Sequence, residues 1–182
     1  MNFDEHSGVR ETIDRLGRIL ASDEWIDEIN PTQWTALSYL ARANRFSRSP
    51  SQVAEYMEST RGTVSQTLKS LAKKGLIVES RSQKDKRSIS YSPTEKGLSV
   101  LQRNNSIDDA VSSIGSEERS ELLAKLEEII RLTLKQRGGR PFGVCQSCKH
   151  HQVKAGAHFC SLLNEPLSVS EASQICHEHE IE

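Results

Sequence analysis

Residues 51–80 read SQVAEYMESTRGTVSQTLKSLAKKGLIVES, and this stretch decides the fold. Its apolar residues recur at steps of three and four, which predicts two short helices with apolar positions at Val53, Ala54 and Met57 and then at Val64, Leu68 and Leu71. Ser59 or Thr60 can cap the second helix, and Gly75 ends it. Two helices joined by so short a turn form a helix-turn-helix.

The second of these helices has an outward face that fits DNA. Its exposed positions are Arg61, Thr63, Ser65, Gln66 and Lys69. In a major groove, arginine and glutamine pair with base edges while serine and threonine bind phosphates. A helix that only faces water would look similar, so this face alone favours DNA modestly.

A basic hairpin follows the helix-turn-helix. Residues 76–78 form a β-prone run, and residues 88–91 alternate polar and apolar side chains, which predicts two paired strands. Their tip is crowded with positive charge from Arg81, Lys84, Lys86 and Arg87. Such a tip can bind the phosphate backbone or the minor groove.

Further helices flank this unit. Asn30-Pro31 and Ser49-Pro50 are helix starts, with a capping side chain before a proline at the first helical position. Thr94 is expected to cap a helix that runs to about residue 113. The first and last helices carry apolar stripes, namely Val9, Ile13, Leu16, Ile19 and Leu20, and then Leu122, Leu123, Leu126, Ile129, Ile130 and Leu134.

Charge is sorted along the 182 residues, although the net charge is only −1. Residues 45–103 hold 12 basic and 5 acidic side chains, net +7, between flanks of net −4 each. A basic middle between acidic flanks predicts one surface aimed at a polyanion. Without a long apolar run or a secretory signal at its acidic N-terminus, the chain is expected to be cytoplasmic, with no membrane partner.

Residues 31–98 resemble the winged helix-turn-helix of MarR-type (multiple antibiotic resistance) transcriptional regulators. The matching stretches are PTQWTALSYLA, the opening quotation and DKRSISYSPTEKG, whose Asp-x-Arg is the wing signature of that family. The resemblance implies that the helix of residues 60–74 enters the major groove. It also implies that Asp85 orients Arg87 toward the minor groove.

The same resemblance gives roles to the flanking helices. It implies an N-terminal dimerisation region over residues 1–30 and C-terminal dimerisation helices over 99–139, around the DNA-binding domain of 31–98. Packing within one chain would use the same apolar residues. A homodimer is favoured, because a two-fold protein reads a palindromic site in double-stranded DNA. The expected fold class is mainly α with a small β-hairpin wing.

Residues 140–182 form a Cys/His-rich tail that is not part of the usual MarR pattern. It holds every cysteine of the chain, in the spacing C-x2-C-x11-C-x15-C, and five of the six histidines. Four thiolates satisfy a tetrahedral zinc site or an iron–sulfur cluster. The preferred ligands are Cys145, Cys148, Cys160 and Cys176. Alternatives replace one cysteine by His179, or use His158.

The cofactor itself stays open between zinc and an iron–sulfur cluster. Zinc ribbons favour two C-x2-C pairs, and this tail has one, which leans the prediction slightly toward a cluster or another redox-active metal. The cofactor either stabilises the tail only, or senses redox or metal status and shifts the adjoining helices.

The leading hypothesis is a homodimeric DNA-binding regulator, a repressor, with a metal site in the tail. A second hypothesis is a MarR-type regulator with structural zinc that responds to a small aromatic effector, for which Trp34 and Tyr39 are candidate contacts; core packing is the better role for Trp34. A third is a thiol oxidoreductase using Cys145 and Cys148, which lack the βαβ setting of redox pairs. No other enzymatic motif is present, so the chain is predicted not to be an enzyme.

Overall fold

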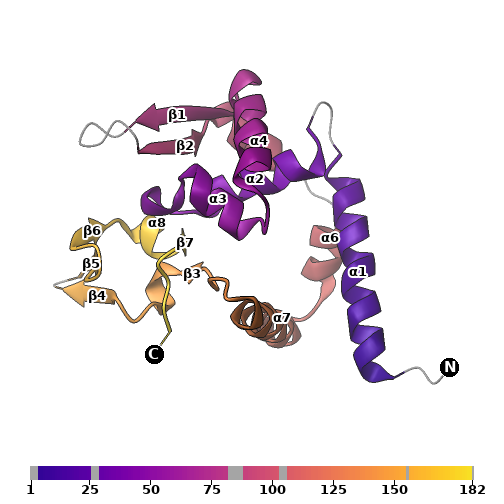
Figure 1. The fold of residues 1–182 in the computed structure, drawn as a ribbon. Coiled ribbons are helices and arrows are strands. Elements are labelled where there is room, and N and C mark those ends of the chain that lie inside the picture. The colour runs from indigo at the N-terminus through magenta and orange to yellow at the C-terminus, as the bar shows by residue number, and fades with distance from the viewer. Residues whose placement is uncertain (1–3, 26–28, 82–87, 103–105, 155, 182) are drawn as a thin grey trace.

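The computed structural model describes residues 4–25, 29–81, 88–102, 106–154 and 156–181. Helices dominate, and the hairpin wing is present, as the sequence predicts. The first half of the chain comprises α1 (Glu5–Asp23), α2 (Pro31–Arg42), the 3₁₀ turn η1 (Arg45–Ser47), α3 (Pro50–Tyr56), α4 (Arg61–Lys73), β1 (Ile77–Arg81) and β2 (Ile89–Pro93). Figure 1 shows the wing strands projecting beside α4.

The second half comprises α5 (Glu95–Leu101), α6 (Ser106–Ser113), α7 (Ser116–Arg137), β3 (Gly143–Val144), η2 (Cys145–Ser147), β4 (His151–Lys154), β5 (Ala157–Cys160), β6 (Glu165–Leu167), α8 (Val169–Ala172) and β7 (Ile175–Cys176). No helix in the described part of the chain combines the length and the apolar character needed to cross a bilayer.

The predicted helix starts are confirmed in detail. Asn30 and Ser49 cap α2 and α3, each in a capping box with the glutamine three residues later and a proline at the start of the helix. Thr60 caps α4, because its hydroxyl accepts a 3.1 Å hydrogen bond from the backbone N–H of Thr63. Gly75 follows α4 with φ of 71°, the left-handed conformation expected of a helix end.

The prediction of a single helix from Thr94 to about residue 113 is wrong. The structure describes two helices there, α5 and α6. A carboxylate from another helix marks the start of α6: Asp23, at the end of α1, accepts hydrogen bonds from the backbone N–H and the hydroxyl of Ser106, at 3.2 and 2.6 Å. A carboxylate at a helix N-terminus satisfies free N–H groups, so this contact fixes a new start.

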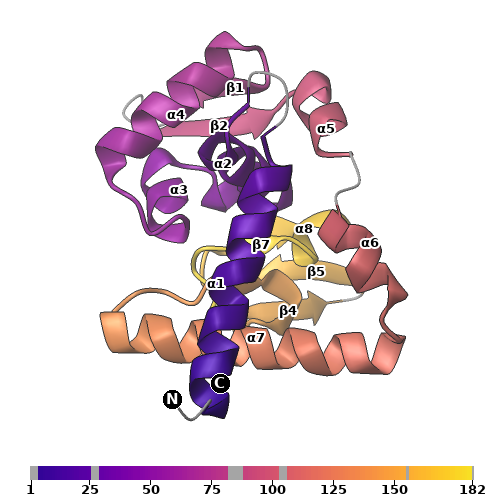
Figure 2. The same cartoon turned by 90° about the vertical axis from the view of Figure 1, so that its right-hand side faces the viewer.

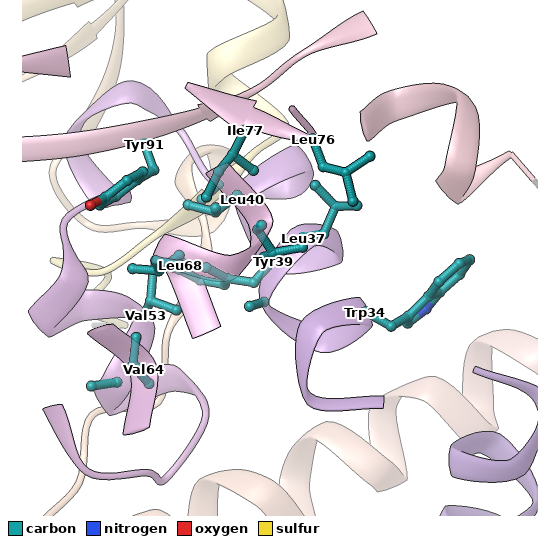
Figure 3. Close-up of a cluster of buried hydrophobic side chains, with 14 of the residues drawn as sticks. Trp34, Leu37, Tyr39, Leu40, Val53, Val64, Leu68, Leu76, Ile77 and Tyr91 are labelled. Atoms are coloured by element: carbon teal, nitrogen blue, oxygen red, sulfur yellow. The ribbon is translucent and has the colours of Figure 1, made fainter. Parts of the chain in front are cut away.

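One core holds the winged helix together. It gathers apolar side chains from α2, α3, α4 and the wing strands, including Leu37, Leu40, Val53, Val64, Leu68, Leu71, Leu76, Ile77 and Tyr91 (Figure 3). Trp34 and Tyr39 belong to this core, and Tyr39 is fully buried. The core packing expected for Trp34 is therefore confirmed, and Tyr39 shares that role.

The tail folds into two small antiparallel sheets that the sequence did not predict. Strands β4, β5 and β6 form one sheet, and β3 pairs with β7 in the other. The second sheet joins the two ends of the tail, because Gly143 lies opposite Cys176. Figures 1 and 2 show the tail lying against the α3 side of the winged helix, between it and α7.

Candidate nucleic-acid interface and cysteine cluster

Helix α4 separates its two faces as the sequence predicts. Val64, Leu68 and Leu71 are fully buried. Arg61, Thr63, Gln66 and Lys69 are exposed and Ser65 is half-buried. The buried face anchors α4 in the core, and the opposite face is left free to meet a partner.

The wing is built on a regular ladder. Strands β1 and β2 pair antiparallel from Ile77 opposite Pro93 to Arg81 opposite Ile89. Glu79 accepts a 2.9 Å hydrogen bond from the hydroxyl of Tyr91 and pairs with Arg81 at 3.1 Å, and these contacts lower the pKa of the Glu79 carboxyl. Lys84, Asp85, Lys86 and Arg87, predicted to contact DNA, lie outside the described residues.

The flanking helices leave their apolar stripes uncovered in the single chain. In the described chain, α1, α6 and α7 contain no buried residue. Exposed apolar side chains include Val9, Ile13, Leu16, Leu122, Leu123, Leu126, Ile129 and Ile130. Helices of 19 and 22 residues draw most of their stability from packing an apolar face, so these stripes need a cover.

The cysteines converge although they are far apart in the sequence. Cys145 and Cys148 bracket the turn η2, closed by a 3.0 Å backbone hydrogen bond between them. Cys160 ends β5 and Cys176 ends β7, and both lie with Cys145 in one buried cluster that also contains Leu167 and touches Phe46. All four cysteines are free thiols.

Hydrogen-bond donors point at the sulfurs. The backbone N–H of Glu180 donates to Sγ of Cys148 at 3.4 Å, and Nδ2 of Asn44 donates to Sγ of Cys145 at 3.8 Å. The hydrogen bond between the two thiols lowers the pKa of Cys176 to about 6, against the effect of burial, and raises the pKa of Cys145. The pair therefore loses its first proton readily and its second with difficulty.

The thiols are gathered but do not stand in a finished metal-binding arrangement. Among the described residues, no group of three or more His, Cys, Asp or Glu side chains could hold a metal ion as it stands. The donor set still fits a thiolate-bound group, because three of the cysteines lie in one buried cluster and two N–H groups donate to sulfur.

The alternative histidine ligands have other neighbours. His158 Nδ1 lies 2.9 Å from Nε2 of His151 across the β4–β5 pair. His179 is buried, with Nε2 3.0 Å from the hydroxyl of Ser147, and its Nδ1 has no hydrogen-bond partner in the described part of the chain. Its ring lies against Gly143, where a Cβ would come within 2.5 Å of it. Burial lowers the pKa of His179.

The tail is anchored on the helix-turn-helix by residues that the sequence analysis did not select. Phe142 makes edge contacts with the rings of Tyr39, Tyr56 and His177 at 6.0, 5.3 and 5.3 Å between centroids. Arg45 pairs with Glu171 of α8. Single polar and aromatic residues in turns carry no periodic signal, so only the fold reveals their partners.

The MarR family model matches residues 28–88, which span α2, α3, α4 and β1 and end before β2. Members of that family are transcription regulators rather than enzymes, in agreement with the expectation that this chain is not an enzyme. A comparison with curated proteins finds no match.

Solved structures share the fold. A MarR transcriptional regulator from Methanosarcina mazei Go1 is 22% identical, covers 71% of this chain and 98% of its own, and has a TM-score of 0.58. The Streptococcus pneumoniae FabT structure in complex with DNA is 20% identical, with coverage of 73% and 99% and a TM-score of 0.56. The S. aureus MepR–DNA complex is 22% identical, with 71% and 98% covered and a TM-score of 0.54.

Proposed function

We propose that this chain is a homodimeric MarR-type transcriptional regulator, a repressor that acts in the cytoplasm and reads double-stranded DNA with α4. The observation that carries the proposal is the division of α4, whose apolar side is locked in the core while Arg61, Gln66 and Lys69 face solvent. Arginine and glutamine reach base edges in a major groove. The similar MepR and FabT folds, both solved with DNA, support the same use here.

The proposed dimer forms through α1 and α7, and α6 lies beside them. Neither of these two long helices has a buried residue in the described part of the single chain. A second copy that packs on their apolar stripes would bury these side chains and stabilise the helices. A two-fold pair of α4 helices calls for a palindromic operator with half-sites about one helical turn apart.

Base reading is tested with DNA selected by the wild-type protein from random duplexes. We expect Arg61→Ala and Gln66→Ala each to weaken binding to the selected site by about 1–3 kcal/mol and to relax the base preference at one position. Lys125→Ala is the matched control, because Lys125 is exposed on α7 and pairs there with Glu128 at 3.2 Å. Unchanged affinity in both α4 variants would refute the proposal.

Wing contact is tested with Arg87→Ala. A phosphate or minor-groove contact predicts weaker binding to every duplex and a salt slope reduced by about 1. Binding titrations at several salt concentrations measure both. If affinity and slope match the wild type, the role given to Arg87 is wrong and α4 alone reads the site.

For the tail, the proposal is that Cys145, Cys148, Cys160 and Cys176 hold zinc or an iron–sulfur cluster that senses metal or redox status. Four free thiols, three of them in one buried cluster, support this assignment, as do the N–H groups aimed at Cys145 and Cys148. Zinc would supply a stable cross-link, whereas a cluster would add an oxidisable centre.

The test is purification without oxygen, followed by an absorbance spectrum and measurement of zinc and iron. A brown protein with a band near ~400 nm identifies a cluster, and a colourless one with one zinc per chain identifies a structural or metal-sensing site. Cys176→Ser should release the metal in either case, while the surface variant Ser170→Ala should not. A protein without zinc or iron would refute the metal site and leave the DNA proposal standing.

A further inference from the structure

The turn between α2 and α3 is bonded to both ends of the tail. Asn44 and Ser47 are polar and fully buried at this turn. The backbone N–H of Asn44 donates to the carbonyl of Ile175 at 2.9 Å, and the hydroxyl of Ser47 accepts from the backbone N–H of His177 at 2.9 Å. These two bonds flank Cys176 on either side.

Asn44 serves the turn and the cysteine cluster at once. Its Oδ1 caps η1 by accepting hydrogen bonds from the N–H of Phe46 and the hydroxyl of Ser47, at 3.0 and 2.8 Å. Its Nδ2 donates to Sγ of Cys145. One buried amide therefore fixes both the start of the turn and the position of a sulfur.

The η1 turn also determines the position of α3, the first helix of the helix-turn-helix. Ser49, two residues beyond Ser47, caps α3, and Nε2 of Gln52 in α3 donates to the carbonyl of Phe46 at 2.9 Å. Near the other end of α3, Glu55 pairs with Nε2 of His177 at 2.9 Å and with Arg140 at 3.6 Å. The tail thus contacts the turn before α3 and Glu55 near the end of α3, and α3 packs directly on α4.

We infer that Asn44 and Ser47 are positioning residues that couple occupation of the cysteine site to the placement of α3 and α4, so that binding of metal or cluster changes DNA affinity. The inference rests on the proposed function of both sites. A metal bound here replaces the hydrogen bond between Cys145 and Cys176 by sulfur–metal bonds, and the buried donors beside these two residues must adjust to the new arrangement or lose their partners. The buried donors belong to η1, so a change in their hydrogen bonds changes the position of this turn. The tail with metal and the tail without metal therefore favour two different positions of α3.

Coupling of this kind is reciprocal. If occupation of the cysteine site changes DNA affinity by some factor, bound DNA changes the affinity for the metal by the same factor. Couplings between protein sites commonly amount to roughly 5- to 150-fold. A change of at least about fivefold in DNA affinity is therefore expected between the loaded and the emptied protein.

The decisive variant is Asn44→Asp. Aspartate keeps the Oδ1 acceptor that caps η1 and removes the amide donor that faces Cys145. Asn30→Asp is the matched control, because Asn30 caps the other end of α2 by accepting a 2.9 Å hydrogen bond from the N–H of Gln33. Ser47→Ala is the second variant and removes the hydroxyl bonded to His177.

The measurement is DNA affinity by fluorescence anisotropy at fixed salt, on full-length protein purified without oxygen, before and after removal of bound metal or cluster by chelation under reducing conditions. Wild type and Asn30→Asp should show the same change of at least about fivefold. In Asn44→Asp and Ser47→Ala the change in DNA affinity between the loaded and the emptied protein should fall toward onefold. For a bound iron–sulfur cluster, the absorption band near ~400 nm should shift in Asn44→Asp and stay fixed in Asn30→Asp.

Two results would overturn the inference alone: a metal-loaded, DNA-binding wild type whose affinity is the same after stripping, or undiminished coupling in both η1 variants. Metal content and DNA binding are measured in the same samples. A wild type that lacks either property fails as the proposed regulator, and the coupling falls with it. The two kinds of failure are therefore told apart.

Discussion

The hydroxyl of Tyr39 donates a 2.6 Å hydrogen bond to the backbone carbonyl of Ser47. The winged-helix core thus holds, from inside, the same turn that the tail holds from outside. Tyr39 is fully buried, and burial raises the pKa of its hydroxyl, so the hydroxyl is protonated and donates at neutral pH. The position of η1 is set jointly by core and tail.

Removing this buried donor should be costly. We expect Tyr39→Phe to lower the free energy of unfolding by about 1–3 kcal/mol, because the Ser47 carbonyl is left without that donor in the core. Tyr56→Phe is the control, since the Tyr56 hydroxyl meets Arg42 at 3.3 Å in an exposed contact, and its loss should cost less than about 0.5 kcal/mol. Urea unfolding measures both. Equal losses would mean that the Tyr39 bond contributes no more than a surface contact.

Gly97 allows α5 to lie against Leu76, the residue just before β1. A Cβ at this position would stand 2.1 Å from the backbone carbonyl oxygen of Leu76. Gly97→Ala should therefore destabilise the winged helix by about 3 kcal/mol or more, because a backbone group must move. Gly62→Ala in α4 is the control, where the nearest atom lies 3.9 Å away and alanine favours the helix. A thermal melt of Gly97→Ala that matches the wild type would contradict this packing.

A charge on the α7 stripe should separate the proposed dimer without unfolding the chain. Ile130 is exposed in the single chain, so Ile130→Lys removes no packing there, yet it would bury a charge between two copies. Light scattering should report a monomer for Ile130→Lys and a dimer for the control Glu127→Lys on the same helix. Full helicity by circular dichroism would show that the fold is intact. A dimeric Ile130→Lys would place the interface elsewhere.

Stability of the tail should decline in mild acid. Burial lowers the pKa of His179, and burial followed by the charge of His158 lowers that of His151, so the folded tail binds fewer protons than the unfolded chain. Stability then rises with pH and is lost as the pH falls through about 6.5, the ordinary histidine value.

Hydrogen exchange of the β4–β5 amides between about pH 7.5 and 5.5 measures this loss. His151→Asn should weaken the pH dependence, and His6→Asn, on the exposed α1, should leave it unchanged. Protection that is constant over this range would show that the two imidazoles do not control the stability of the tail.

The sequence was sufficient to locate the winged helix. Its helix starts are local devices, such as Asn30-Pro31 and Ser49-Pro50, and local hydrogen bonds do not depend on the rest of the fold. The buried face of α4 followed from periodicity alone. The break between α5 and α6 could not be predicted, because Asp23, which bonds to the first residue of α6, stands 83 residues earlier.

The tail shows the other limit of sequence reasoning. Cysteine spacing predicted a shared four-cysteine site, which stays a prediction, and it gave no hint that Asn44 would face Cys145 from 101 residues away. The strands of the tail could not be predicted from the sequence either. Each is only two to four residues long, which is too short for an alternating pattern of polar and apolar residues. Single contacts between distant segments are properties of the folded chain.

Because the tail binds back to η1, the winged helix and its contacts with the tail form in a fixed order during synthesis. The bond from Asn44 to Cys145 closes a separation of 101 residues, and that from Ser47 to His177 closes one of 130. A ribosome making about 5–20 residues per second therefore releases the winged helix several seconds before the segment that seals it. Each new molecule passes through an interval in which α4 is formed and its tail is not yet docked, and only a chain translated past His177 can complete the bonds to the turn.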